Sequence, residues 1–165
     1  FKRYNLYNRI GVYNFMELKK LVVDSKAKWI DFAGLDGFSV EVANLSRKEL
    51  TGIRKKCTTT KFNRRTRQAE ETLDEDKFVT EFTRATLKNW KGLTLAHLET
   101  LILIDTDGQD MSKEVEYSEE NAEVLVGQSA EFDTWLNEVV FDLENFRSEP
   151  KRVVPKATGG NVSKS

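Results

Sequence analysis

The spacing of apolar residues predicts a β-ribbon near the N-terminus. Residues 29–32 are mostly apolar, and apolar and polar residues alternate over residues 38–42, as expected for two short strands. The segment between them contains Asp36 followed by Gly37, a pair typical of a hairpin turn. Residues 21–23 are expected to add an edge strand. Because a lone hairpin is marginally stable in water, we expect this ribbon to pack against helices.

The first predicted helix begins at Ser46. Its side chain is positioned to cap the helix, and Glu49, three residues later, completes a capping box. Leu50, Ile53 and Cys57 then recur at intervals of three and four residues, which places them on one face of the helix. Cys57 is therefore expected to be a buried core residue and not a reactive thiol.

Four further helices are expected after a polar loop. Residues 58–72 show no regular spacing and are interpreted as that loop. Thr72 and Glu75 form a second capping-box pattern, and the helix that follows is expected to end at Gly92. The predicted caps of the remaining three helices are Thr94, Ser118 and Ser129. The pattern as a whole predicts an α+β fold, with a small N-terminal antiparallel β-ribbon packed on about five mostly amphipathic helices.

The chain length of 165 residues fits one folded domain. We expect residues 16–147 to form it, because they carry the regular patterns, and we interpret Met16 as the natural start. Residues 1–15 have no clean period and are interpreted as a leader or a non-native extension, disordered in either case. Residues 148–165 contain both prolines and no regular spacing, so we predict a disordered tail.

Charge is distributed unevenly along the chain, although the net charge is only −1. Nine lysines and arginines but one acid lie in residues 47–67, whereas residues 99–149 contain fifteen acids and two bases. Either the two regions face each other within the fold, or they form a dipolar surface that steers a charged partner.

Several kinds of chemistry find no support in the sequence. With His97 and Cys57 as the only strong nitrogen and sulfur ligands, a zinc site is not expected. Residues 105–116 resemble an EF-hand loop, but Asp110 occupies the position where the turn requires glycine. There is no glycine-rich phosphate loop. The longest apolar run, residues 101–104, is too short for a membrane span. We therefore predict a protein that is not an enzyme and has no cofactor.

The basic stretch allows three interpretations: a solvated surface, a protein-binding surface or a nucleic-acid-binding surface. Phe62 is the only aromatic residue within it, which disfavours nucleic acid because base recognition usually adds stacking side chains. We expect an acidic or amphipathic protein partner instead. Trp90, expected at a helix end and half exposed, is added to the predicted contact residues. These are Arg47, Arg54, Lys55, Lys56, Arg64, Arg65 and Trp90.

Six segments, in order, carry a family resemblance: GLDGF, LSRKEL…IRKKC, DEDKF, WKGLTL, YSEENA and FDTWLNEVVFDLENF. Together they resemble the tail assembly chaperones of long-tailed bacteriophages, over about residues 18–146. The resemblance implies a non-enzymatic protein that binds and solubilises the tape measure protein and is released as tail-tube subunits polymerise. It further implies action in the host bacterial cytoplasm and absence from the mature virion.

Two functions of other classes stay open at the level of sequence. A small nucleic-acid-binding regulator would use residues 47–67, and a structural tail completion protein would persist in the particle. Under the chaperone interpretation the expected partners are the tape measure protein and tail-tube subunits, together with self-association. No membrane partner is expected.

Overall fold

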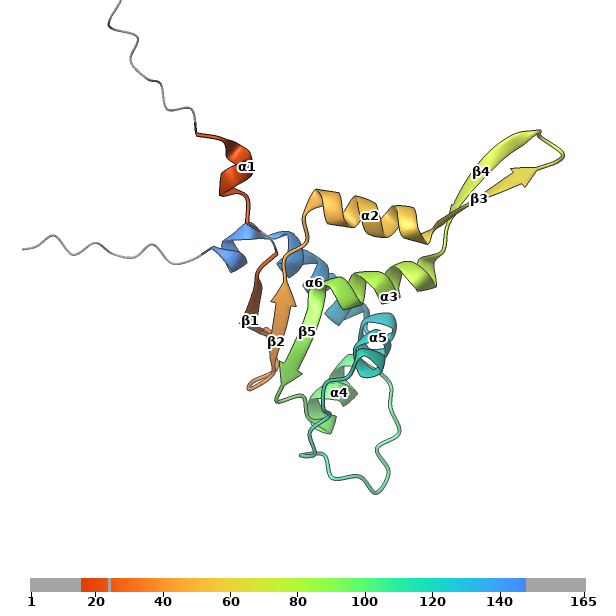
Figure 1. The fold of residues 1–165 in the computed structure, drawn as a ribbon. Coiled ribbons are helices and arrows are strands. Elements are labelled where there is room, and N and C mark those ends of the chain that lie inside the picture. The colour runs from red at the N-terminus through yellow and green to blue at the C-terminus, as the bar shows by residue number, and fades with distance from the viewer. Residues whose placement is uncertain (1–15, 24, 148–165) are drawn as a thin grey trace, which may run out of the picture.

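The computed structural model describes residues 16–23 and 25–147 and has the predicted α+β architecture (Figure 1). Residues 1–15 and 148–165, for which we predicted disorder, lie outside the described residues. A three-stranded antiparallel sheet has the order β1-β2-β5, and β3 and β4 form a separate hairpin. The strands are β1 (Ala27–Asp31), β2 (Ser39–Ala43), β3 (Thr58–Asn63), β4 (Gln68–Leu73) and β5 (Leu87–Lys91). The helices are α1 (Leu18–Leu21), α2 (Arg47–Cys57), α3 (Glu75–Thr86), α4 (Leu95–Leu101), α5 (Glu119–Gln128), α6 (Ala130–Phe141) and the 3-10 turn η1 (Leu143–Phe146).

The predicted N-terminal ribbon is confirmed as the pair β1–β2. Ile30 lies opposite Val40 and Trp29 opposite Glu41 in this pair. The tight connection contains Gly34 and Gly37, both with positive φ angles that favour glycine. Residues 21–23, predicted as an edge strand, are instead the end of the short helix α1 and the extended segment after it.

Strand β5 is the main departure from the sequence prediction. The helix expected to run to Gly92 ends at Thr86, and the chain continues as β5, paired with β2. A register shift between Glu41 and Val42 leaves Val40 opposite Trp90 and Val42 opposite Leu87. The extra residue in β5 lets Leu87 and Trp90 both face the core despite a spacing of three. That spacing imitates helical periodicity, and the prediction was wrong because pairing with β2 decides the structure here.

Gly92 follows the last residue of β5, at the point where the chain passes close to the β1–β2 turn. Its φ angle is +73°, and a Cβ atom at this position would lie 2.0 Å from the Gly37 carbonyl oxygen. The glycine was correctly singled out, but it follows a strand and not a helix. Its role is to allow close approach of the backbone after β5 to the β1–β2 turn.

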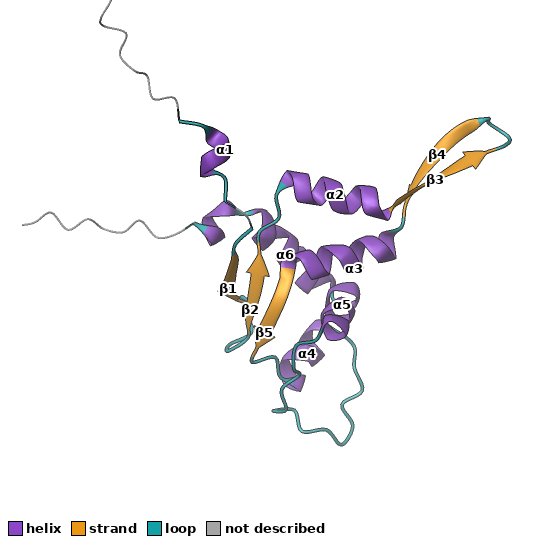
Figure 2. Cartoon of the chain, in the orientation of Figure 1, coloured by secondary structure: helices purple, strands orange, loops and turns teal. Residues whose placement is uncertain are grey.

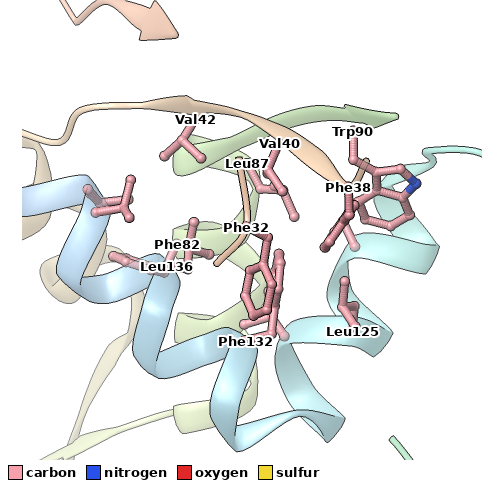
Figure 3. Packing of buried hydrophobic residues seen from close by; sticks show 14 of the residues in the cluster. Phe32, Phe38, Val40, Val42, Phe82, Leu87, Trp90, Leu125, Phe132 and Leu136 are labelled. Carbon is pink, nitrogen blue, oxygen red and sulfur yellow. The ribbon is translucent and has the colours of Figure 1, made fainter. Parts of the chain in front are cut away.

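The hydrophobic core lies between the sheet and the helices α3, α5 and α6 (Figure 3). Phe32, Phe38 and Phe132 meet at its centre, with ring centroids 5.6 to 6.2 Å apart. Trp135 of α6 is half-buried and packs against Phe32. Trp29 is different, because 44% of its surface is exposed. It lies on the outer face of the sheet beneath Lys91, whose Nζ is 4.7 Å from the ring centroid.

Most of the predicted helix starts are confirmed. The hydroxyls of Ser46, Thr94, Ser118 and Ser129 each accept a backbone N–H in the first turn of a helix. The start of α3 is the exception. Asp74, not Thr72, is its cap, because Thr72 is already paired with Thr59 in the second hairpin.

That second hairpin replaces the loop predicted for residues 58–72. It projects from the ends of α2 and α3, away from the sheet (Figure 2). Threonines and Phe62 give β3 a strand-forming composition that periodicity did not show. The turn is closed by Asn63, whose side-chain oxygen accepts the backbone N–H groups of Arg65 and Thr66. We call residues 58–73 the arm.

Candidate protein-binding surfaces

The structure divides the basic stretch between α2 and the arm. Arg47, Lys48, Arg54, Lys55 and Lys56 lie on α2, and the other four basic residues lie on the arm. Within the described part of the chain, none of the nine forms an ion pair with the acidic residues of 99–147. Ion pairs therefore do not join the two charged regions in this part of the chain, which is compatible with the dipolar surface considered above.

Two of the predicted contact residues hold α2 against α3. Lys56 Nζ donates to the Glu81 carboxylate at 2.6 Å, and this hydrogen bond lowers the pKa of Glu81. The Arg54 guanidinium lies over the Phe78 ring, 5.8 Å from its centroid. Because these groups already have partners within the chain, we assign Arg54 and Lys56 a structural role between the helices.

Arg47 and Lys55 lie instead on the open side of α2. Together with Lys48, Thr51 and Gly52 they line a shallow depression. Gly52 sits in the middle of the helix with no atom near the position of a Cβ, so the helix backbone is accessible between the basic side chains. A partner can approach the helix closely at this point while its acidic groups meet the three cations.

An exposed apolar segment, residues 16–23, reaches the start of α2 through its last two residues. Its five large apolar residues are exposed, with 56 to 78% of the surface of each residue accessible to solvent: Met16, Leu18, Leu21, Val22 and Val23. The two valines line a second depression whose wall includes Lys48, the residue that also lines the first. Isolated exposed apolar residues are common, but a contiguous group is typical of interaction sites. We call these five residues, with Arg47, Lys48 and Lys55, the α1–α2 surface.

The start of α2 is rigid enough to present this surface in a fixed way. The Ser46 hydroxyl accepts the Glu49 backbone N–H, and the Glu49 carboxylate accepts the Ser46 backbone N–H at 2.8 Å. Hydrogen bonding of the Glu49 carboxylate to the Ser46 hydroxyl, and then to the Ser46 backbone N–H, lowers the pKa of Glu49. Leu45, directly before the cap, is buried and anchors the helix to the core.

The arm carries the remaining predicted contact residues, Arg64 and Arg65. Both lie in its exposed turn, next to Arg67, which has a φ of 58°, a strained value for a residue with a side chain. Phe62 precedes the turn and is 66% exposed. The arm thus presents a phenyl ring beside a group of cations, a combination absent from the sequence-based prediction of a loop.

Trp90 is not a surface residue, and its prediction as a half-exposed contact was wrong. Only 5% of it is exposed, because β5 directs it into the core. Its indole N–H donates to the Val115 carbonyl oxygen at 2.7 Å, and its ring meets Tyr117 edge to face. Trp90 therefore holds the 111–118 segment against the sheet. Burial raises the pKa of the neighbouring Tyr117 hydroxyl, which donates to the Leu87 carbonyl oxygen.

The thiol of Cys57 and the imidazole of His97, the two strong metal-ligand groups noted in the sequence, have roles in packing and hydrogen bonding. Cys57 is buried, as predicted. His97 lies in the first turn of α4 with Nδ1 3.0 Å from the Gly92 carbonyl oxygen. Among residues 16–23 and 25–147 no three His, Cys, Asp or Glu side chains gather as a metal site would require. No helix in these same residues is both long enough and apolar enough to cross a membrane.

Comparison with protein-family models, with curated proteins and with solved structures finds no match to this chain.

Proposed function

We propose that the protein is a phage tail assembly chaperone that binds and solubilises the tape measure protein through the α1–α2 surface. The proposal joins the family resemblance of the sequence to one structural observation. That observation is a depression lined by Arg47, Lys48 and Lys55 of α2, beside a second depression in which the exposed Val22 and Val23 share a wall with Lys48. We expect the assembling tail-tube subunits to displace the chaperone in the host cytoplasm, so that it is absent from the mature virion.

The chemistry of this surface fits a long amphipathic helix. Such a client aggregates through its apolar stripe unless that stripe is covered. The exposed leucines and valines of residues 16–23 offer an apolar contact, and Arg47, Lys48 and Lys55 offer cations for acidic residues along the edge of the stripe. Release during tail assembly requires reversible binding, which a shallow, open surface supports better than a deep groove.

The test is binding of the tape measure protein of the same phage to surface variants. Reversing Arg47, Lys48 and Lys55 to Glu should weaken binding by about tenfold or more at low salt, and less at high salt. The matched control reverses Lys61, Arg64 and Arg65, an equal change of charge on the arm, and should retain binding to a client peptide short enough to contact a single copy. Equal binding by the native protein and the α2 variant would refute the assignment of this surface.

A nucleic-acid-binding regulator is the second candidate, and the arm is the observation that favours it. A two-stranded β-ribbon fits the major groove of DNA, and three arginines lie at its turn. Its strands, however, also carry Glu70 and Glu71. These acids would lie along the phosphate backbone of an inserted ribbon, which makes this function the weaker of the two.

A further inference from the structure

Among the residues that the structure describes, none covers either face of the arm. Its strands have six residues each, so it extends about 20 Å. All strand residues except Thr58, Asn63 and Leu73 are exposed, and Phe62 points into solvent near the turn. A two-stranded ribbon of this kind is marginal in water by itself, and it gains stability when one of its faces is covered.

An apolar cleft lies at the other end of the molecule. It is formed by α4, α5 and the segment between them, and its accessible walls include Leu98, Ile102, Val115 and Val124. Leu103, next to Ile102, is fully exposed. Figure 1 shows the α4–α5 segment below the sheet. The arm lies on another side of the molecule, beyond the C-terminal end of α2 and the N-terminal end of α3.

The two ends differ in charge. The arm has Lys61, three arginines at the turn and two glutamates, a net charge of +2 with every cation in or near the turn. Residues 105–120 contain seven acids and one base, Lys113, a net charge of −6. Glu114 and Glu116 directly flank Val115 of the cleft. The residues that line the cleft include no acid, but one of its walls belongs to the strongly acidic segment 105–120, whereas Phe62 of the arm is close in sequence to the basic residues of the turn.

We propose that the arm of one copy docks on the α4–α5 cleft of a second copy, with Phe62 covering the cleft and Arg64 and Arg65 facing Glu114 and Glu116. The arm cannot reach the cleft of its own chain. It projects from the N-terminal end of α3, whereas the cleft follows β5, so the body of α3 (about 18 Å long) and β5 lie between them. The contact therefore joins copies.

This association is independent of the α1–α2 surface, which neither the arm nor the cleft includes. A copy whose arm is occupied can still present Arg47, Lys48 and Lys55 to a client. Copies linked in this way would offer several α1–α2 surfaces to one long helix, and the avidity of such an array exceeds the affinity of each site.

The first test is the oligomeric state of the full chain, measured by analytical ultracentrifugation at about 5 to 100 μM in 50 mM and 500 mM salt, concentrations chosen to span weak protein association. The native protein should associate reversibly, and less at high salt. Phe62→Ala and the double variant Arg64→Glu/Arg65→Glu should each weaken association by about tenfold or more. The control Arg47→Glu/Lys55→Glu should associate like the native protein. A native chain that stays monomeric throughout overturns the proposal.

A charge exchange makes the test specific for these two surfaces. The variant Glu114→Lys/Glu116→Lys should be as deficient in association as Arg64→Glu/Arg65→Glu when each is measured alone. Mixing the two should restore association, because the reversed arm then meets a reversed cleft and the native arm meets a native cleft. A mixture that remains monomeric contradicts the arm–cleft contact. So does tight binding of a DNA or RNA oligonucleotide to the native arm with a steep negative salt dependence, which identifies the arm as a nucleic-acid ribbon.

Discussion

The protein contains two β-hairpins, and they are used in different ways. In the β1–β2 hairpin, Phe38, Val40 and Val42 are completely buried, because β5 extends the sheet and helices cover its inner face. In the β3–β4 arm both faces are open, and the one aromatic side chain, Phe62, is exposed. Burial of apolar area is what stabilises the first hairpin. The second contributes little to the core, and its side chains are available to other molecules.

This comparison predicts opposite results for two phenylalanines. Phe132→Ala removes a ring at the centre of the core, where it packs on Phe32 and Phe38, and should lower the free energy of unfolding by about 3–5 kcal/mol. Phe62→Ala should change it by less than about 0.5 kcal/mol, because the ring has no core contacts. Denaturant unfolding of both variants measures the difference, and equal losses of stability would contradict the distinction between the two hairpins.

Gly92→Ala tests how strictly the first hairpin depends on β5. The added Cβ would collide with the Gly37 carbonyl oxygen, and the residue would have to keep a positive φ angle. We expect a loss of roughly 1–3 kcal/mol in the free energy of unfolding. Gly108→Ala is the matched control, since its φ is also positive but nothing lies near its Cβ position. A smaller loss for Gly92 than for Gly108 would argue against the close approach of the two turns.

Ser46→Ala should lower the free energy of unfolding by about 1 kcal/mol through loss of the α2 cap. The capping box also predicts a pH dependence. Because its hydrogen bonds lower the pKa of Glu49 in the folded state, their contribution is present above the pKa of an unfolded glutamate and is lost as the pH falls through the folded value. The stability difference between Ser46→Ala and the native protein should therefore shrink in acid. A difference independent of pH between 7 and 3 would contradict a contribution of the Ser46 hydroxyl to the lowered pKa of Glu49.

Shortening the arm should have only a small effect on the fold. Replacing residues 60–71 with Asn-Gly joins the paired residues Thr59 and Thr72 by a two-residue hairpin turn. Cooperative thermal unfolding should persist, with a melting temperature within about 4 °C of the native value, which corresponds to roughly 1 kcal/mol or less in a protein of this size. Loss of cooperative unfolding would show that the arm belongs to the folding unit.

Local signals in the sequence were sufficient where short-range interactions decide the structure. The cap at Ser46 and the turn around Gly37 depend on residues within a few positions of each other, and both were predicted. Strand β5 was not predicted, because its partner β2 is more than forty residues away and the bulge gives Leu87 and Trp90 a helix-like spacing. Once the strand was missed, Trp90 was placed at a helix end and on the surface.

The candidate surfaces were predictable only in part. The basic stretch is visible in the sequence, but the engagement of Arg54 and Lys56 by α3 depends on how the helices pack. The arm was missed because its strands are exposed on both faces and so lack the alternation that identifies a half-buried strand. The run of threonines followed by Asn63 was the available signal for a hairpin.

The proposed chaperone function is tested most directly by the solubility of the proposed client. A tape measure protein encoded in the same genome as this chain should be expressed alone, with the native chain, and with the variant in which Arg47, Lys48 and Lys55 are reversed to Glu, and its soluble fraction measured after centrifugation. We predict that the native chain makes most of the tape measure protein soluble and that the variant, folded and equally abundant, does not. A tape measure protein that stays insoluble with the native chain, or that the variant solubilises equally well, would contradict a chaperone acting through the α1–α2 surface.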